Sequence, residues 1–275
     1  MNVLFDEPGP RGRRRIRIAT AAAFVLGAAV LGLALYQFGV NGQLDPKKWQ
    51  PYGTWPMWKY LLNGLGGTLL AAGLVLVLAM PLGLLLAFGR MSRYRWIRLP
   101  ARTYIEVFRV VPALLMVFMM LFALPRYGLD LPTLWKLVVP LTLNRSAQLA
   151  GVFRAGILSL DAGQGEAAAA LGLRPWQAMW HVILPQALRH VLPSLISQSV
   201  GTVKDTSLGY VLSFAEVITI GKQLASYNRY LIQTYLVIAL IYFVVNFALS
   251  RLGRWLERRE RRVGHVAAPA DPGII

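Results

Sequence analysis

Residues 163–190 read GQGEAAAALGLRPWQAMWHVILPQALRH, and they separate two long apolar parts of the chain. The stretch is amphipathic and rich in alanine, and glycine and proline punctuate it. Glu166, Arg174 and two histidines interrupt the apolar sequence found on either side. The neighbouring segments therefore decide where this stretch lies, and its own pattern decides what it can contact.

The chain is too apolar for an ordinary soluble domain. Of its 275 residues 56% are hydrophobic and only 15% are charged, whereas about a quarter are charged in soluble domains. Segments 18–38 and 61–88 contain no charged side chain, and both exceed the roughly 18–20 residues that span a bilayer. The first is also too long for a signal peptide, so we interpret it as a retained anchor. We expect an all-α integral membrane protein.

A net charge of +17 could suggest nucleic-acid binding, but the positions of the positive charges indicate a membrane protein instead. Arginines cluster at 11–17, 90–102 and 251–262, and each cluster flanks an apolar run. Such clusters mark the cytoplasmic side of a membrane protein. With an even number of spans, both termini lie in the cytoplasm, and we expect a multi-pass protein of the bacterial cell membrane.

Six apolar runs predict transmembrane helices, at roughly 16–39, 61–89, 103–125, 133–158, 186–218 (interrupted) and 230–251. The remaining segments are a basic cytoplasmic N-terminus at 1–15, an external loop at 40–60, a cytoplasmic insert at 163–185 and a tail at 259–275 that we expect to be disordered. The sequence has no cysteine, which excludes disulfides and thiolate metal sites. We expect no metal site and no catalytic residue.

Within the insert, local signals predict a helix, a tight turn and a second helix. Asp161 and Gly163 precede a helix-forming run that begins at Glu166, with the acid in the first turn. Gly172 suits a left-handed C-terminal stop, and Pro175 suits the first position of the next helix. The alanines give a smooth surface. On helix physics alone this hairpin either docks in a groove of another protein or rests on lipid headgroups.

The spacing of this insert resembles the EAA motif of permease subunits of ABC transporters. That motif is Glu-Ala-Ala, three residues, Gly, nine residues and then Ile-x-Leu-Pro; Val182 replaces the isoleucine here. The resemblance covers roughly residues 60–258 and implies a permease domain at 61–258, with the span at 16–39 as an addition to the usual five. By this resemblance the residues that couple to the ATPase are Gly165, Glu166, Ala167, Ala168, Gly172, Leu184 and Pro185.

The same resemblance implies the partners of the chain. In this family the insert is a coupling helix that docks on an ATP-binding subunit, and a second permease subunit (as a heterodimer, or else a homodimer) and an external substrate-binding protein complete the importer. ATP and magnesium belong to the ATP-binding subunit, and this chain needs no cofactor. It has no G-x-x-x-x-G-K-[ST] phosphate loop. The run KDTSLGYVLSFAEV at 204–217 is similar to permeases for glutamate, glutamine or aspartate.

Two polar clusters interrupt the predicted spans. Lys204 and Asp205 follow Pro193, taken as the inner interface, by roughly 16 Å of helix, which is near the bilayer centre, where charges tend to be paired and to face protein or water. We expect these two residues, with Thr206 and Ser207, to line the substrate pathway at a broken helix. The alternative is an ion pair that only fixes helix packing.

The second cluster is in the span at 133–158. Asn144, Arg145 and Gln148 share one helical face, and a guanidinium matches a carboxylate with two parallel hydrogen bonds. Arg145 therefore either contacts the substrate or pairs with an acid of the partner permease. Two rival functions remain at this stage: a self-sufficient secondary transporter, and an intramembrane enzyme, for which the sequence has no catalytic motif.

Overall fold

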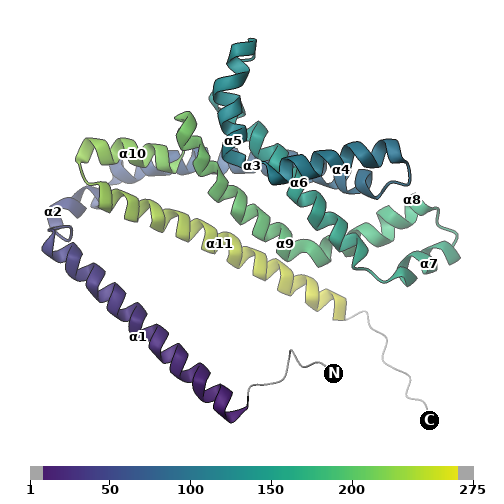
Figure 1. Cartoon of the computed structure of the whole chain (residues 1–275), viewed down its shortest axis with the longest axis horizontal. Coiled ribbons are helices and arrows are strands. Elements are labelled where there is room, and N and C mark those ends of the chain that lie inside the picture. Colours follow the sequence, from purple (N-terminus) through teal and green to yellow (C-terminus); the bar gives the residue numbers. More distant parts are fainter. Residues whose placement is uncertain (1–8, 266–275) are drawn as a thin grey trace. The chain divides into compact units, whose positions relative to one another are not determined.

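The structure is a computed structural model that describes residues 9–265, and every regular element in that range is helical (Figure 1). The predicted all-α fold is therefore confirmed for this part of the chain. Predictions that fall on residues 1–8 and 266–275, which include most of the basic N-terminus and much of the tail, lie outside the described residues.

The chain divides into two compact units, residues 1–57 and 58–275. The first unit contains helix α1 (Pro10–Val40), the short helix α2 (Pro46–Trp49) and the 3-10 helix η2 (Gln50–Gly53). α1 contains the predicted first span and buries none of its residues. After it the chain turns back on itself, and the Trp49 indole donates a hydrogen bond of 3.0 Å to the carbonyl of Gln43.

The second unit holds the predicted permease domain. Its elements are α3 (Trp55–Met91), α4 (Arg95–Val110), α5 (Ala113–Phe118), η3 (Met119–Ala123), η4 (Leu124–Tyr127), α6 (Thr133–Leu158), α7 (Ala162–Ala170), α8 (Pro175–Ala178), η5 (Met179–Ile183), α9 (Leu184–Asp205), η6 (Thr206–Leu212), α10 (Val217–Asn228) and α11 (Leu231–His265). α9 and α11 lie side by side in Figure 1 and pack against each other.

Three described helices are long and apolar enough to cross a membrane, namely α1, α3 and the part of α11 from Leu231 to Leu256. α4 and the helical segment 113–127 meet the same criterion together, but they are bent by 96°. α6 coincides with the predicted span 133–158, yet its polar residues and those of α9 keep both helices outside this set. The number of six spans stays a prediction.

The predicted span at 103–125 is not one straight helix. It breaks at Val111 and Pro112, which separate α4 from α5. Val111 has an extended backbone, with φ −65° and ψ 124°, because the proline ring disfavours the helical conformation in the residue before it. Because the segment is apolar on both sides of the break, its composition predicted one continuous span.

α6 lies at the centre of the second unit and packs against α3, α4 and α9. On one side Gly83 of α3 approaches Leu149 so closely that an added Cβ would lie 2.8 Å from its Cβ. On another side Phe153 packs with Val191 and Leu195 of α9. Helices in lipid associate through such close packing, because the lipid removes the hydrophobic driving force between them. This packing fixes which faces of α6 and α9 meet.

Candidate functional site

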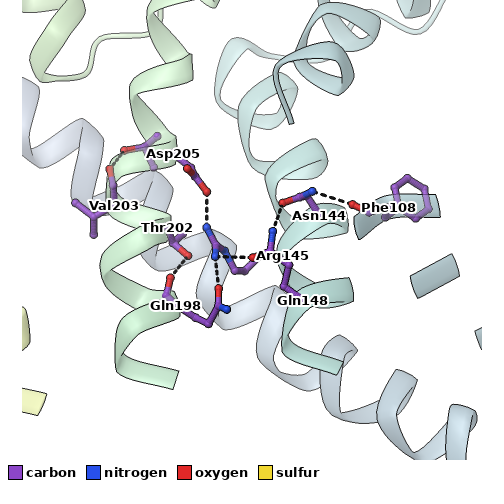
Figure 2. Close-up of polar contacts among 9 residues, drawn as sticks. Phe108, Asn144, Arg145, Gln148, Gln198, Thr202, Val203 and Asp205 are labelled. Carbon is purple, nitrogen blue, oxygen red and sulfur yellow. Dashed lines mark hydrogen bonds and ion pairs between the residues drawn. The ribbon is translucent and has the colours of Figure 1, made fainter. Parts of the chain in front are cut away.

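A buried arginine lies at the centre of a polar network between α6 and α9 (Figure 2). Arg145 of α6 is only 6% exposed. Its guanidinium forms an ion pair with the carboxylate of Asp205, the last residue of α9. The same guanidinium donates hydrogen bonds to the side-chain oxygens of Gln198, also on α9, and of Gln148, at 3.1 Å. The network therefore joins the two helices in the interior of the second unit.

Asn144 extends this network to a third helix. The side-chain amide of Gln148 donates to the Asn144 side-chain oxygen at 2.7 Å, and the Asn144 amide donates to the backbone carbonyl of Phe108 at 2.8 Å. Phe108 belongs to α4. One continuous chain of polar contacts thus holds α4, α6 and α9 together, and the predicted cluster of Asn144, Arg145 and Gln148 is its middle part.

The structure corrects the predicted pairing of Lys204 with Asp205. Asp205 pairs with Arg145, whereas Lys204 is exposed and forms no ion pair with the described side chains of residues 9–256. Consecutive residues of a helix point about 100° apart, so Asp205 faces α6 while Lys204 faces α11. Arg145 has an acid partner within its own chain, and the alternative that it pairs with an acid of another subunit is not needed to explain its burial.

The predicted break after Asp205 is present. α9 ends there and continues as the 3-10 helix η6, which ends at Ser213 in the left-handed conformation. Thr206 is fully buried, and its hydroxyl donates to the carbonyl of Val203 at 2.7 Å. Ser207 is half-buried. Neither residue contacts Arg145, so the structure brings together only part of the predicted pathway.

A cavity of about 600 Å³ adjoins the network. The residues that line it are Arg109, Gln148, Gly151, Val152, Ala155, Val191, Ser194 and Gln198. These described residues include one cation and no acid. Gln148 and Gln198 use their side-chain oxygens to accept from Arg145, and one N–H of Gln148 donates to Asn144. The other N–H of Gln148 and the amide of Gln198 remain to face other ligands. The cavity therefore presents hydrogen-bond donors and a positive charge, which suit a carboxylate or an amide oxygen.

The insert at 163–185 forms the predicted hairpin of two helices. The side chain of Asp161 caps α7 by accepting from the Gly163 N–H at 2.7 Å. Gly172 ends the helix with φ +77°, and its N–H donates to the carbonyl of Ala169 at 2.9 Å, a geometry that favours glycine. Pro175 begins α8 as predicted. These local expectations are confirmed.

Two details of the hairpin differ from the prediction. α7 begins at Ala162, which places Glu166 in the second turn rather than the first, because capping by Asp161 starts the helix earlier. Pro185 does not interrupt the chain: the π-helical segment η5 leads directly into α9. Proline in the interior of an α-helix clashes with the carbonyl four residues before it, and the π-helical turn just before Pro185 changes the hydrogen-bond ladder at this point.

The hairpin exposes apolar side chains together with its small residues. Leu171 is 82% exposed and Trp176 is 57% exposed, while Ala167 is exposed and Ala168 is buried against the rest of the hairpin. Of the predicted coupling residues, Leu184 is buried and Pro185 is exposed. Figure 1 shows the hairpin beyond the ends of α6 and α9. Its accessible apolar surface is of the kind that another protein covers.

Glu216, which was not predicted as a candidate residue, is fully buried. Its carboxylate caps α10 by accepting from the N–H groups of Ile218 at 2.8 Å and Thr219 at 2.6 Å, and it accepts from the Tyr242 hydroxyl of α11 at 3.2 Å. An acid that directly precedes an apolar helical run is a recognisable capping signal. We interpret Glu216 as a structural residue.

Comparisons with known proteins agree with this architecture. Residues 79–262 match the profile of the family described as "binding-protein-dependent transport system inner membrane component". A glutamate transport system permease protein of Corynebacterium glutamicum is 39% identical over 85% of this chain and 90% of its own length. A probable glutamine ABC transporter permease protein of Bacillus subtilis is 35% identical over 73% of this chain and 94% of its own length.

A solved structure is similar as well. It is described as the crystal structure of an amino acid ABC transporter with histidines, and one of its chains aligns with a TM-score of 0.69 and 34% identity. The alignment covers 73% of this chain and 94% of that one.

Proposed function

The chain belongs to the family of inner membrane components of binding-protein-dependent transport systems, and from this premise we propose that it is the permease subunit through which an ATP-driven importer moves glutamate, glutamine or aspartate. The family membership makes it a membrane-embedded, non-catalytic permease subunit of an ABC importer. The choice of substrate is our proposal, and the permeases from Corynebacterium and Bacillus support it through the substrates in their names.

The observation that carries this choice is the composition of the cavity beside Arg145. Arg109 supplies a positive charge, and Gln148 and Gln198 supply amide N–H groups, while none of the described residues that line the cavity is acidic. Moving a carboxylate out of water is unfavourable unless donors replace its hydration. A cavity of this composition favours a side chain that ends in a carboxylate or an amide, and it disfavours a cationic amino acid.

We assign the predicted pathway residues to different roles. Gln148 faces the substrate. Arg145 and Asp205 neutralise each other, and with Asn144 they hold the two glutamines in position. Thr206 and Ser207 form the helical turn at which α9 ends, and they position Asp205.

The hairpin formed by α7 and α8 is, in this proposal, the coupling element. Gly165, Glu166, Ala167 and Ala168 of α7 and the turn at Gly172 dock on a separate ATP-binding subunit, and Leu184 and Pro185 connect this contact to α9. ATP and magnesium are held by that subunit. An external binding protein delivers the substrate, a second permease subunit completes the pathway, and both termini of the chain lie in the cytoplasm.

The test is uptake by the complete transporter, reconstituted in vesicles with its binding protein. Arg109→Gln should lower glutamate uptake about tenfold or more, because one charge-assisted hydrogen bond to a carboxylate is lost, and it should lower glutamine uptake much less. Arg102→Gln is the matched control, since Arg102 is exposed on the same helix but pairs with Glu106 at 2.7 Å and is not among the residues that line the cavity. Equal losses for both substrates, or for both arginines, would contradict the assignment.

A further inference from the structure

Lys204 lies in a second polar cavity, on the other side of α9 from the Arg145 network. This cavity has a volume of about 510 Å³, and Lys204 of α9 lines it together with Tyr242, Phe243, Asn246 and Phe247 of α11. We call it the α9–α11 groove. A smaller cavity of about 300 Å³ continues it toward Pro193 and Gly253. The groove is thus a long opening between two adjacent helices, and the proposed substrate cavity shares no lining residue with it.

The depth of Lys204 makes this groove unusual. The residues of α11 that line it with Lys204 surround the middle of the apolar segment Leu231–Leu256, which is long enough to cross the membrane. An ammonium group at that depth is unfavourable in lipid, and such groups face protein or water. Lys204 is exposed and has no ion pair with the side chains that the structure describes, those of residues 9–256. At this depth Lys204 therefore needs a polar partner from outside the described part of the chain.

Two further observations indicate that a polar partner covers the groove. The side-chain oxygen of Asn246 is buried without a hydrogen-bond partner, although a buried acceptor normally has one. Beside the groove, the rings of Phe243 and Phe247 stack with 5.9 Å between their centroids, and they are 64% and 50% exposed. Exposed aromatic side chains next to a desolvated charge are typical of the centre of a protein interface.

We propose that the α9–α11 groove is the docking site for a transmembrane helix of a second, non-identical permease subunit, and that this helix carries a carboxylate at mid-membrane depth that pairs with Lys204. The proposal rests on the function given above, because it names the partner of the same importer. The stacked phenylalanines pack against the apolar side of the incoming helix. A donor on that helix satisfies Asn246.

Charge also decides against a second copy of this chain on this face. A symmetric dimer places the same surface patch of both copies in contact. Up to Leu256, the described residues of α9 and α11 include one acid, Asp205, and it already pairs with Arg145. The same patch on a second copy would therefore offer Lys204 no free carboxylate at membrane depth. A different subunit that presents an acid supplies this partner.

The first experiment measures assembly of the complete transporter from membranes, with an affinity tag on the second permease. We expect Lys204→Glu to lower the amount of this chain recovered with the tagged subunit about tenfold or more, because it opposes a carboxylate with a carboxylate. Lys204→Met should lower it less. Lys222→Met is the matched control, since Lys222 of α10 is also exposed but lies over the ring of Tyr210 of η6. When Lys204→Glu is combined with replacement of a mid-membrane acid of the partner by lysine, recovery of this chain with the tagged subunit should be restored.

The second experiment uses the absence of cysteine from the chain. A single Phe247→Cys variant should cross-link to the second permease through a short thiol reagent, whereas Phe122→Cys, also exposed at 60%, serves as the control on another element. Cross-linking of Phe247→Cys to a second copy of this chain would overturn the proposal, as would normal recovery of Lys204→Glu. Substrate-protected labelling of Lys204→Cys by a charged, water-soluble thiol reagent would also overturn it, because the groove would then be a water-filled part of the pathway. If uptake of glutamate and glutamine is absent from the unmodified transporter while these assembly results hold, the proposed function fails and the interface does not.

Discussion

Asp205→Asn is expected to destabilise the protein more than Arg145→Gln, although the two residues form one ion pair. The reason is their unequal burial: the Arg145 side chain is 7% exposed, whereas that of Asp205 is 40% exposed. Without the carboxylate, the guanidinium stays buried with only neutral amide oxygens as acceptors. Stranding a buried charge in this way costs about 3–5 kcal/mol.

The converse change is milder. When Arg145 is replaced, Asp205 and the two glutamines still border accessible surface and can be hydrated, so the loss should be closer to about 1–2 kcal/mol. At roughly 2–4 °C per kcal/mol for a chain of this size, Asp205→Asn lowers the unfolding midpoint by about 6–20 °C, and Arg145→Gln by about 2–8 °C. The double variant should fall between them, because it removes the stranded charge.

The assay heats the purified transporter in lipid nanodiscs and measures, by size exclusion, the fraction that stays assembled at each temperature. The order of the three midpoints carries the test. An Arg145→Gln midpoint below that of Asp205→Asn, or a double variant worse than either single change, would refute the reasoning from unequal burial.

Three other changes test the hairpin and the packing. Gly172→Val should abolish ATP hydrolysis stimulated by the loaded binding protein while the chain still inserts in the membrane, because φ is +77° there; stimulation equal to that of the unmodified transporter would contradict this. Gly67→Ala should reduce the yield of folded protein severely, since its Cβ would lie 2.1 Å from a backbone oxygen, whereas Gly73→Ala, with nothing within 4 Å, should be tolerated; equal yields would refute the close approach. Glu216→Gln should destabilise the protein by about 1–3 kcal/mol in the same thermal assay, because an amide N–H then faces backbone and hydroxyl donors, and an unchanged midpoint would show that this cap is dispensable.

Local features of the fold could be predicted from the sequence because nearby residues determine them. The turn at Gly172 and the start of α8 at Pro175 depend on the conformations that glycine and proline allow. The bounds of α6 also agree with the apolar run at 133–158. The break at Val111 was not predicted although Pro112 indicates it, because the segments on both sides of the proline are apolar and together fit the length of one span.

The partners in the polar network could not be predicted from the sequence. Arg145 and Asp205 are sixty residues apart, and their contact depends on which faces of α6 and α9 pack together. Adjacency along the chain suggested Lys204 as the partner of Asp205, yet helix geometry turns adjacent side chains away from each other. A single amide such as Gln198 in a polar helix is not a specific sequence signal. Its role becomes clear only from its contact with Arg145.

The chain is helical without interruption from Pro175 to Asp205, through α8, η5 and α9. The hairpin and the polar network therefore lie on one helical segment, with a fixed angular relation between them. Each residue of a helix turns it by about 100°, so inserting a single residue between Gln186 and Ser197 would leave both sequence motifs intact while turning Gln198 and Asp205 away from Arg145. The number of residues between the two motifs therefore matters for function. The segment that joins them should tolerate substitutions far better than an insertion or a deletion.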